Sequence, residues 1–215
     1  AATLKDSYRW RLFAVLAANL VLLYVAAVYD TIRLDGIRAV ASDWEQAWKD
    51  IGAVALAAVV TTILNGILSP DAKARIVFWR WQHPLPGCRA FSHYLKKDFR
   101  IDFAALSSAL SELPTDPGAQ NALWYRRIYG PVKDHALVLQ VHGEYLFSRD
   151  YAGASALFLV VLGAVGAYVI ESPKTVWLYL ALLAAQLVAA TLAARHYGMR
   201  FVATAAAVWQ QRGMP

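Results

Sequence analysis

Residues 176–194 read VWLYLALLAAQLVAATLAA, a stretch without a single charged side chain. An α-helix rises 1.5 Å per residue, so a run of this length can cross the roughly 30 Å hydrocarbon core of a bilayer. Three further apolar runs occur at about 12–29, 51–68 and 151–170. A buried helix of a soluble protein is the alternative for any single run, but four such runs in 215 residues indicate membrane spans.

The composition of the chain agrees with this interpretation. Hydrophobic residues make up 59% of it and charged residues 17%, against roughly 45–50% and 25% in soluble globular domains. Cys88 is the one cysteine, which excludes an internal disulfide. The sequence therefore predicts an all-α membrane protein with four transmembrane helices and a helical cytoplasmic domain inserted between the second and third.

The four apolar runs divide the chain into three parts. We expect an N-terminal transmembrane hairpin at 1–68, a cytoplasmic helical domain at 69–150, and at 151–215 a C-terminal transmembrane hairpin followed by a cytoplasmic tail. Helix breakers mark two of the joins: Ser69 and Pro70 end the second run, and the ESPK turn at 171–174 separates the last two.

The distribution of lysine and arginine predicts the orientation of these parts. Residues 1–11 carry Lys5, Arg9 and Arg11, and the 69–150 segment is also rich in basic residues, whereas the turn at 171–174 has only Lys174. Basic residues are enriched on the cytoplasmic side of membrane proteins. We therefore expect both termini and residues 69–150 to face the cytoplasm.

The loop between the first two spans has a pattern of its own. In residues 37–48, apolar side chains such as Ile37, Trp44 and Trp48 recur at helical spacing, and polar ones take most of the other face. This pattern is typical of an amphipathic helix that lies on the outer leaflet or caps the helix bundle. The alternative is that the segment continues the second helix outward.

The inserted segment is also expected to be helical. The pattern predicts helices at about 71–83, 103–112, 119–129 and 131–150, and the last of these continues directly into the third span. Asp102 has the position and chemistry of an N-cap for the second helix.

Two stretches of this segment combine aromatic and basic residues, VFWRWQHPLPGCRAFS at 77–92 and WYRRIYG at 124–130. Aromatic faces stack on bases, and guanidinium groups pair with phosphate, so the pattern favours a nucleotide or oligonucleotide ligand. The alternative is that these residues anchor the domain at the membrane surface and meet anionic lipid. The candidate ligand-binding residues are Trp79, Arg80, Trp81, Arg89, Lys96, Lys97, Trp124, Arg126 and Arg127.

The sequence offers no comparable pattern for catalysis. The histidines have no metal-binding spacing, and no phosphate-binding glycine loop or nucleophile elbow is present. We therefore expect neither an enzyme nor a bound metal or cofactor.

Polar and small residues inside the apolar runs are candidates for a pore or for helix packing. Amides at membrane depth usually face another helix or water, and glycines permit close helix approach. The residues concerned are Asn19, Asn65, Gln186, Gly163 and Gly166. Four short helices leave little room for an internal conduit, so we expect a homo-oligomer, with a tetramer as the first expectation.

The segments at 77–92 and 124–130, together with HGEYLFSRD at 142–150, resemble small membrane effectors of bacterial nucleotide-signalled antiviral defence systems, among them the Hailong type. In such systems a partner nucleotidyltransferase makes a nucleotide signal, and the membrane protein responds by forming or gating a pore. The resemblance implies a multi-pass protein of the bacterial inner membrane, and it assigns no individual residue.

Two functions follow as hypotheses. The first is a ligand-controlled oligomeric membrane effector or ion channel in antiviral defence, with a basic cytoplasmic domain that senses a nucleotide-type signal. The second is a non-conducting membrane anchor or scaffold that recruits a cytoplasmic partner protein. A hydrated path in an oligomer would favour the first, and a dry monomeric bundle the second.

Overall fold

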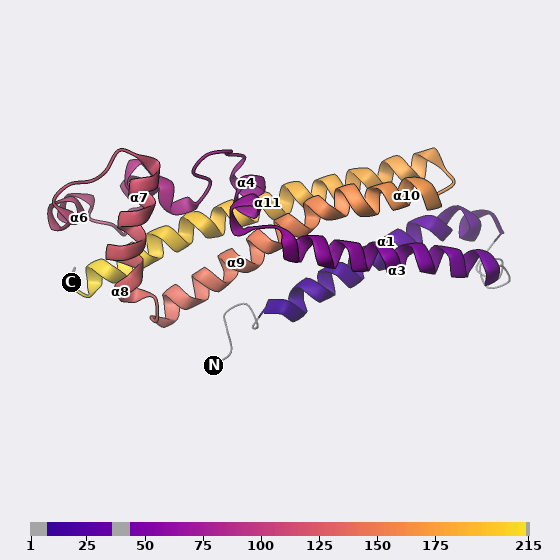
Figure 1. Ribbon diagram of the computed structural model, residues 1–215, viewed down its shortest axis with the longest axis horizontal. Helices are drawn as coiled ribbons and strands as arrows, with labels where there is room; N and C mark the ends of the chain where they lie inside the picture. The colour runs from indigo at the N-terminus through magenta and orange to yellow at the C-terminus, as the bar shows by residue number, and fades with distance from the viewer. Residues whose placement is uncertain (1–7, 36–43, 214–215) are drawn as a thin grey trace. The chain divides into compact units, whose positions relative to one another are not determined.

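The computed structural model describes residues 8–35 and 44–213, and every regular element in these two ranges is helical (Figure 1). Contacts within the chain divide it into two compact units. We call residues 8–35, 44–69 and 150–190 the apolar unit, and residues 70–149 and 191–213 the basic unit.

The apolar unit contains four complete elements and parts of two others. These are α1 (Arg9–Asp35), α3 (Trp44–Ile67), η5 (Phe158–Leu162) and α10 (Gly163–Val169), with the C-terminal part of α9 (Ala136–Leu157) and the N-terminal part of α11 (Pro173–Gln211). α9, η5 and α10 follow one another directly, and a short turn joins α10 to α11 (Figure 1). Pro173 begins α11, where its missing N–H costs no helical hydrogen bond.

The basic unit is built from shorter elements. These are α4 (Pro70–Phe78), η2 (Pro86–Arg89), η3 (Ala90–Tyr94), α5 (Leu95–Lys97), α6 (Phe103–Leu110), α7 (Pro117–Leu123), η4 (Trp124–Tyr129) and α8 (Gly130–Val132), with the remaining parts of α9 and α11. Two of the helix starts have aspartate caps. Asp102 accepts a hydrogen bond from the Ala105 N–H at 3.0 Å, as predicted, and Asp116 accepts one from the Ala119 N–H at 2.8 Å.

Three helices among the described residues are long and apolar enough to cross a membrane, namely Trp10–Tyr29, Ala136–Val169 and Pro173–Gln211. These helices account for the predicted spans at 12–29, 151–170 and 176–194 in position and composition. The remaining predicted span, 51–68, falls on α3, where Ala58–Ile67 forms a shorter apolar helix. Helix length and composition thus agree with a membrane protein.

The predicted amphipathic segment at 37–48 lies partly outside the described residues, which resume at Trp44. From Trp44 onward the backbone belongs to α3. Residues 44–48 therefore extend the second helix at its N-terminal end, in line with the alternative interpretation.

α11 differs from the predicted helix and tail. It was expected to end near residue 194, yet it continues to Gln211. Arg195 ends the apolar run, but a charged side chain does not break a helix. The extension is held by burial, because Phe201, Val202 and Trp209 are all buried in the basic unit.

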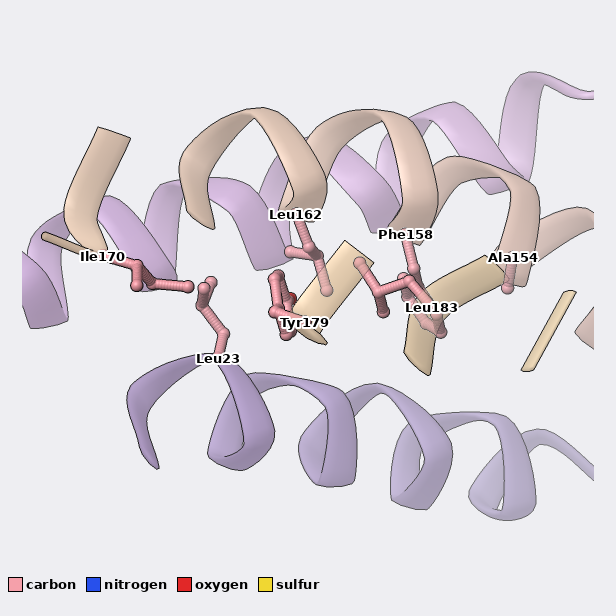
Figure 2. Close-up of a cluster of buried hydrophobic side chains, with 7 residues drawn as sticks. All are labelled: Leu23, Ala154, Phe158, Leu162, Ile170, Tyr179 and Leu183. Atoms are coloured by element: carbon pink, nitrogen blue, oxygen red, sulfur yellow. The ribbon is translucent and has the colours of Figure 1, made fainter. Parts of the chain in front are cut away.

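The core of the apolar unit is a cluster of buried, mostly apolar side chains. Figure 2 shows Leu23 of α1 facing residues of η5 and α11, and the cluster comprises Leu23, Ala154, Phe158, Leu162, Ile170, Tyr179 and Leu183. Two glycines allow the helices to approach this closely. A Cβ on Gly163 would lie 2.9 Å from Leu180, and one on Gly166 would lie 2.7 Å from the Tyr179 ring.

Candidate functional site

One candidate binding site of the basic unit is a cavity of about 520 Å³ between the segment at 93–100 and α11. Its basic and histidine side chains are His93, Lys97, Arg100, His196 and Arg200, and the rest of the lining is Tyr94, Asp98, Phe99, Met199 and Ala203. Asp98 is the one acidic residue in this lining. The cavity, which we call the cationic pocket, thus carries excess positive charge.

The chain turn after α5 shapes one wall of the cationic pocket. Asp98 has an extended backbone at the end of α5, and its carboxylate accepts hydrogen bonds from Arg100: the backbone N–H at 3.0 Å and the guanidinium at 2.9 and 2.7 Å. These bonds lower the pKa of Asp98. Phe99 lies between Asp98 and Arg100 in this turn, and its side chain is 97% exposed. An aromatic face is therefore available beside the charged groups.

α11 forms the opposite wall. His196 and Arg200 are four residues apart and therefore lie on one face of the helix. The Arg100 guanidinium also donates to the Thr204 hydroxyl at 3.5 Å, one turn beyond Arg200. Residues about one hundred positions apart in the sequence are thus joined in a single site.

Several predicted cations act on the same histidine of this pocket. Desolvation, followed by the positive charges of Lys97, Arg89 and Arg80, lowers the pKa of His93. Positive charge from three predicted ligand-binding residues therefore converges on His93. A neutral imidazole there donates one hydrogen bond and accepts another, while the surrounding cations attract an anion.

The other predicted ligand-binding residues have different surroundings. Lys96 is exposed, and its ammonium lies 5.4 Å from the Phe103 ring centroid. Arg126 and Arg127 are exposed on η4. Trp79, Arg80 and Trp81 line a second cavity of about 470 Å³ together with Ala72, Arg75 and Ile76.

Trp124 was predicted to stack on a ligand, but its position in the fold corrects this. The side chain is only 3% exposed. Its ring stacks on Tyr129 at 5.6 Å and meets Phe201 edge-on at 5.2 Å between centroids. Both contacts belong to the core of the basic unit, which leaves no open face for a base.

Sequence reasoning missed the half of the cationic pocket that α11 supplies, together with His93, Phe99 and Arg100. One signal was available: Arg195, His196 and Arg200 form a basic group directly after the apolar run. The pairing of this group with the segment at 93–100 depends on tertiary contacts that no local pattern encodes.

Comparison of the chain with protein-family models, with curated proteins and with solved structures finds no match. The geometry of the site therefore carries the functional argument.

The polar residues of the apolar unit are distributed over several helices. Asn19 is buried on α1, and its amide donates to the Val15 carbonyl at 2.9 Å. Asn65 on α3 and Gln186 on α11 are half-buried, and Gln186 shares a hydrogen bond with Tyr151. Gly163 and Gly166 pack against Leu180 and Tyr179 of the same chain.

Proposed function

We propose that the chain is a four-span protein of the bacterial inner membrane whose basic unit lies in the cytoplasm and binds a phosphate-bearing ligand of nucleotide type. Ligand binding in this proposal controls an oligomeric membrane effector or ion channel that acts in antiviral defence. The observation that carries the proposal is the cationic pocket, in which basic side chains surround a cavity beside the exposed ring of Phe99.

The size and chemistry of the cationic pocket suit such a ligand. A volume of about 520 Å³ falls within the roughly 300–1,000 Å³ of small-molecule sites. Lys97 and Arg200 can bind phosphate oxygens, each with about 1.5–3 kcal/mol for a charge-assisted hydrogen bond. Phe99 offers a face on which a base can stack.

Control of the apolar unit has a simple candidate route through α11. This helix is continuous from Pro173 to Gln211, with its first part in the apolar unit and His196 and Arg200 lining the cationic pocket. A ligand that binds two states of the pocket differently shifts their populations. A shift from 1:99 to 99:1 needs about 5.5 kcal/mol, which two to four charge-assisted contacts supply.

A binding measurement on the purified, detergent-solubilised protein tests the pocket. The probes are fluorescently labelled ATP and a labelled six-nucleotide single-stranded DNA, followed by fluorescence anisotropy. The double variant Lys97→Gln, Arg200→Gln is expected to lose at least tenfold in affinity for a bound probe, whereas Arg127→Gln, Lys133→Gln removes the same charge elsewhere and should stay within about threefold. Equal binding by wild type and the first double variant would reject the cationic pocket as the site.

A flux assay tests the membrane half of the proposal. Protein reconstituted in liposomes is assayed for ion flux with and without each probe, and its subunit number is measured by native mass spectrometry. We expect an oligomer, with a tetramer as the first expectation, and a flux that the probe changes. Gln186→Leu, which replaces a polar side chain in the apolar unit, should alter the flux without altering probe binding.

A scaffold that recruits a cytoplasmic partner protein is the second candidate function. The apolar cluster around Leu23, Phe158 and Tyr179 favours it, because these packed side chains offer no polar groups that would line a conduit at their level. A monomeric mass together with no flux under any probe condition would make the scaffold the better account.

A further inference from the structure

The second cavity of the basic unit has its own chemistry. It measures about 470 Å³, and Arg75 and Arg80 are the charged residues in its lining. Trp79 and Trp81 stand at its edge, 70% and 83% exposed. We propose that this cavity, the Trp–Arg cavity, binds the phosphate headgroup of an anionic membrane phospholipid, with the two indoles in the interfacial layer of the bilayer.

The charge pattern of α11 indicates at which level of the bilayer the Trp–Arg cavity lies. Between Lys174 and Arg195 the helix has no charged residue. These two positions are about 32 Å apart at 1.5 Å per residue, close to the roughly 30 Å of the hydrocarbon core. When this stretch spans the bilayer, Lys174 and Arg195 therefore mark its opposite surfaces.

Arg195 is in direct contact with the edge of the Trp–Arg cavity. Its guanidinium lies 4.4 Å from the Trp79 ring centroid, and its Nε–H donates to the Val77 carbonyl. Both partners belong to the basic unit. Trp79 is therefore held near the level of Arg195, which is the membrane surface.

The length of α4 agrees with this depth. α4 begins at Pro70, three residues after α3 ends at Ile67, and it has nine residues. A helix of this length measures about 14 Å. Trp79, the residue after α4, is thus tied within about 26 Å of the end of α3, because each extended residue adds at most about 3.5 Å.

The backbone at Trp79 has an unusual conformation. Trp79 directly follows α4 and has a φ of 52°, in the left-handed region that a bulky side chain rarely adopts. Its N–H still donates to the Arg75 carbonyl at 2.8 Å, and Arg195 covers its ring. Exposed tryptophans that are fixed in this way are costly in water but favourable at a membrane interface.

Arg80 lines the cavity and has an unpaired guanidinium nitrogen. Its guanidinium lies 5.8 Å from the Phe78 ring centroid, and its Nη1 is buried without a hydrogen-bond partner among the described residues. A buried, unpaired donor is destabilising by roughly 1–3 kcal/mol or more. A lipid phosphate in the cavity would accept from Arg80 and pair with Arg75, and its acyl chains would remain in the bilayer beside the indoles.

This inference requires α11 to cross the membrane, but it does not depend on ligand control through the cationic pocket. The test is native mass spectrometry of the full-length protein in detergent, with phosphatidylglycerol or phosphatidylcholine added in equal amounts. Wild-type protein is expected to retain phosphatidylglycerol preferentially. The double variant Arg75→Gln, Arg80→Gln should lose at least fivefold of that preference.

The matched control is Lys133→Gln, Arg212→Gln, which removes the same charge from exposed positions of the basic unit outside both aromatic-basic stretches, and it should keep the preference. An equal loss of phosphatidylglycerol preference in the control would show that net charge alone determines the preference, and it would overturn the proposal. So would an absence of preference in wild type, or displacement of phosphatidylglycerol by millimolar inorganic phosphate, which would identify a site for soluble phosphate. Circular dichroism of each variant checks that the helices are intact.

Discussion

Asp98 is the residue that limits the positive charge of the cationic pocket. Its carboxylate holds Arg100 through the guanidinium and the backbone N–H. Asp98→Asn keeps an acceptor oxygen but removes the charge, so we expect ATP to bind about fivefold more tightly, equivalent to ~1 kcal/mol for a partly exposed charge. Anisotropy titrations measure this change, and Glu112→Gln is the control, an exposed carboxylate outside the pocket.

The effect of Asp98 should depend on pH in a defined direction. Arg100 lowers the pKa of Asp98, so the wild-type carboxylate stays ionised throughout the neutral range and down past the usual carboxyl pKa. The advantage of Asp98→Asn is therefore expected to be constant around pH 7. It should disappear only as the pH falls through the lowered pKa of the wild-type carboxyl. A gain that fades between pH 8 and 6 would contradict this explanation.

Gly166 sets the spacing of two helices in the apolar unit. A Cβ there would lie 2.7 Å from the Tyr179 ring and 3.4 Å from Leu23. Gly166→Ala is expected to destabilise the unit by about 1–3 kcal/mol, because a packed core cannot absorb the added volume freely. Thermal unfolding in detergent measures the loss. Gly66→Ala is the control: nothing lies within 4 Å of its new Cβ, and a stability gain from helix propensity of about 0.5–1 kcal/mol is expected.

At the residue scale, local chemistry could be predicted and remote packing could not. Asp102 was identified as a cap because an aspartate before an apolar helical run satisfies a free N–H wherever the helix lies. Trp124 was assigned to a ligand because Arg126 and Arg127 follow it. Its burial depends on Phe201, far away in the sequence, whose ring meets it at 5.2 Å.

At the scale of elements, the side chain of Gln210 joins the end of α11 to the start of α6 by hydrogen bonds. Gln210 accepts from the Asp102 N–H at 3.2 Å and donates to the Asp102 carbonyl at 2.7 Å. Gln210→Ala removes both bonds, so we expect a loss of about 1–3 kcal/mol in the stability of the basic unit. Chemical unfolding followed by tryptophan fluorescence measures it. Gln211→Ala, at the neighbouring exposed position, should change the stability by less than about 0.5 kcal/mol.

Some helix boundaries could likewise be predicted from local chemistry, and others could not. Pro70 and Pro173 begin helices as their chemistry dictates. Hydropathy, however, locates a membrane span and not the end of a helix, which is why α11 continues past residue 194. The half of the cationic pocket on α11 was missed for this reason, since His196 and Arg200 had been assigned to a tail.

At the scale of the whole molecule, the topology can be tested by cysteine labelling. On a Cys88→Ser background, Glu112→Cys in the basic unit should react with a membrane-impermeant maleimide only after the cells are permeabilised. Lys174→Cys, in the first turn of α11, should react in intact cells. The expected pattern follows from the distribution of basic residues. Labelling of the residue-112 cysteine in intact cells would show that the basic unit faces the outside, opposite to the prediction.

The path of α11 also has a consequence for the order in which the protein is made. The segment at 70–149 leaves the ribosome well before Phe201 and Trp209, two side chains buried in the core of its unit. The segment must therefore remain incomplete through the synthesis of two apolar runs. Completion of α11 and closure of the basic unit then become a single late event. A chain that ends before Phe201 would leave the core of the basic unit open to proteases. Truncated chains are therefore expected to be degraded faster than the full chain.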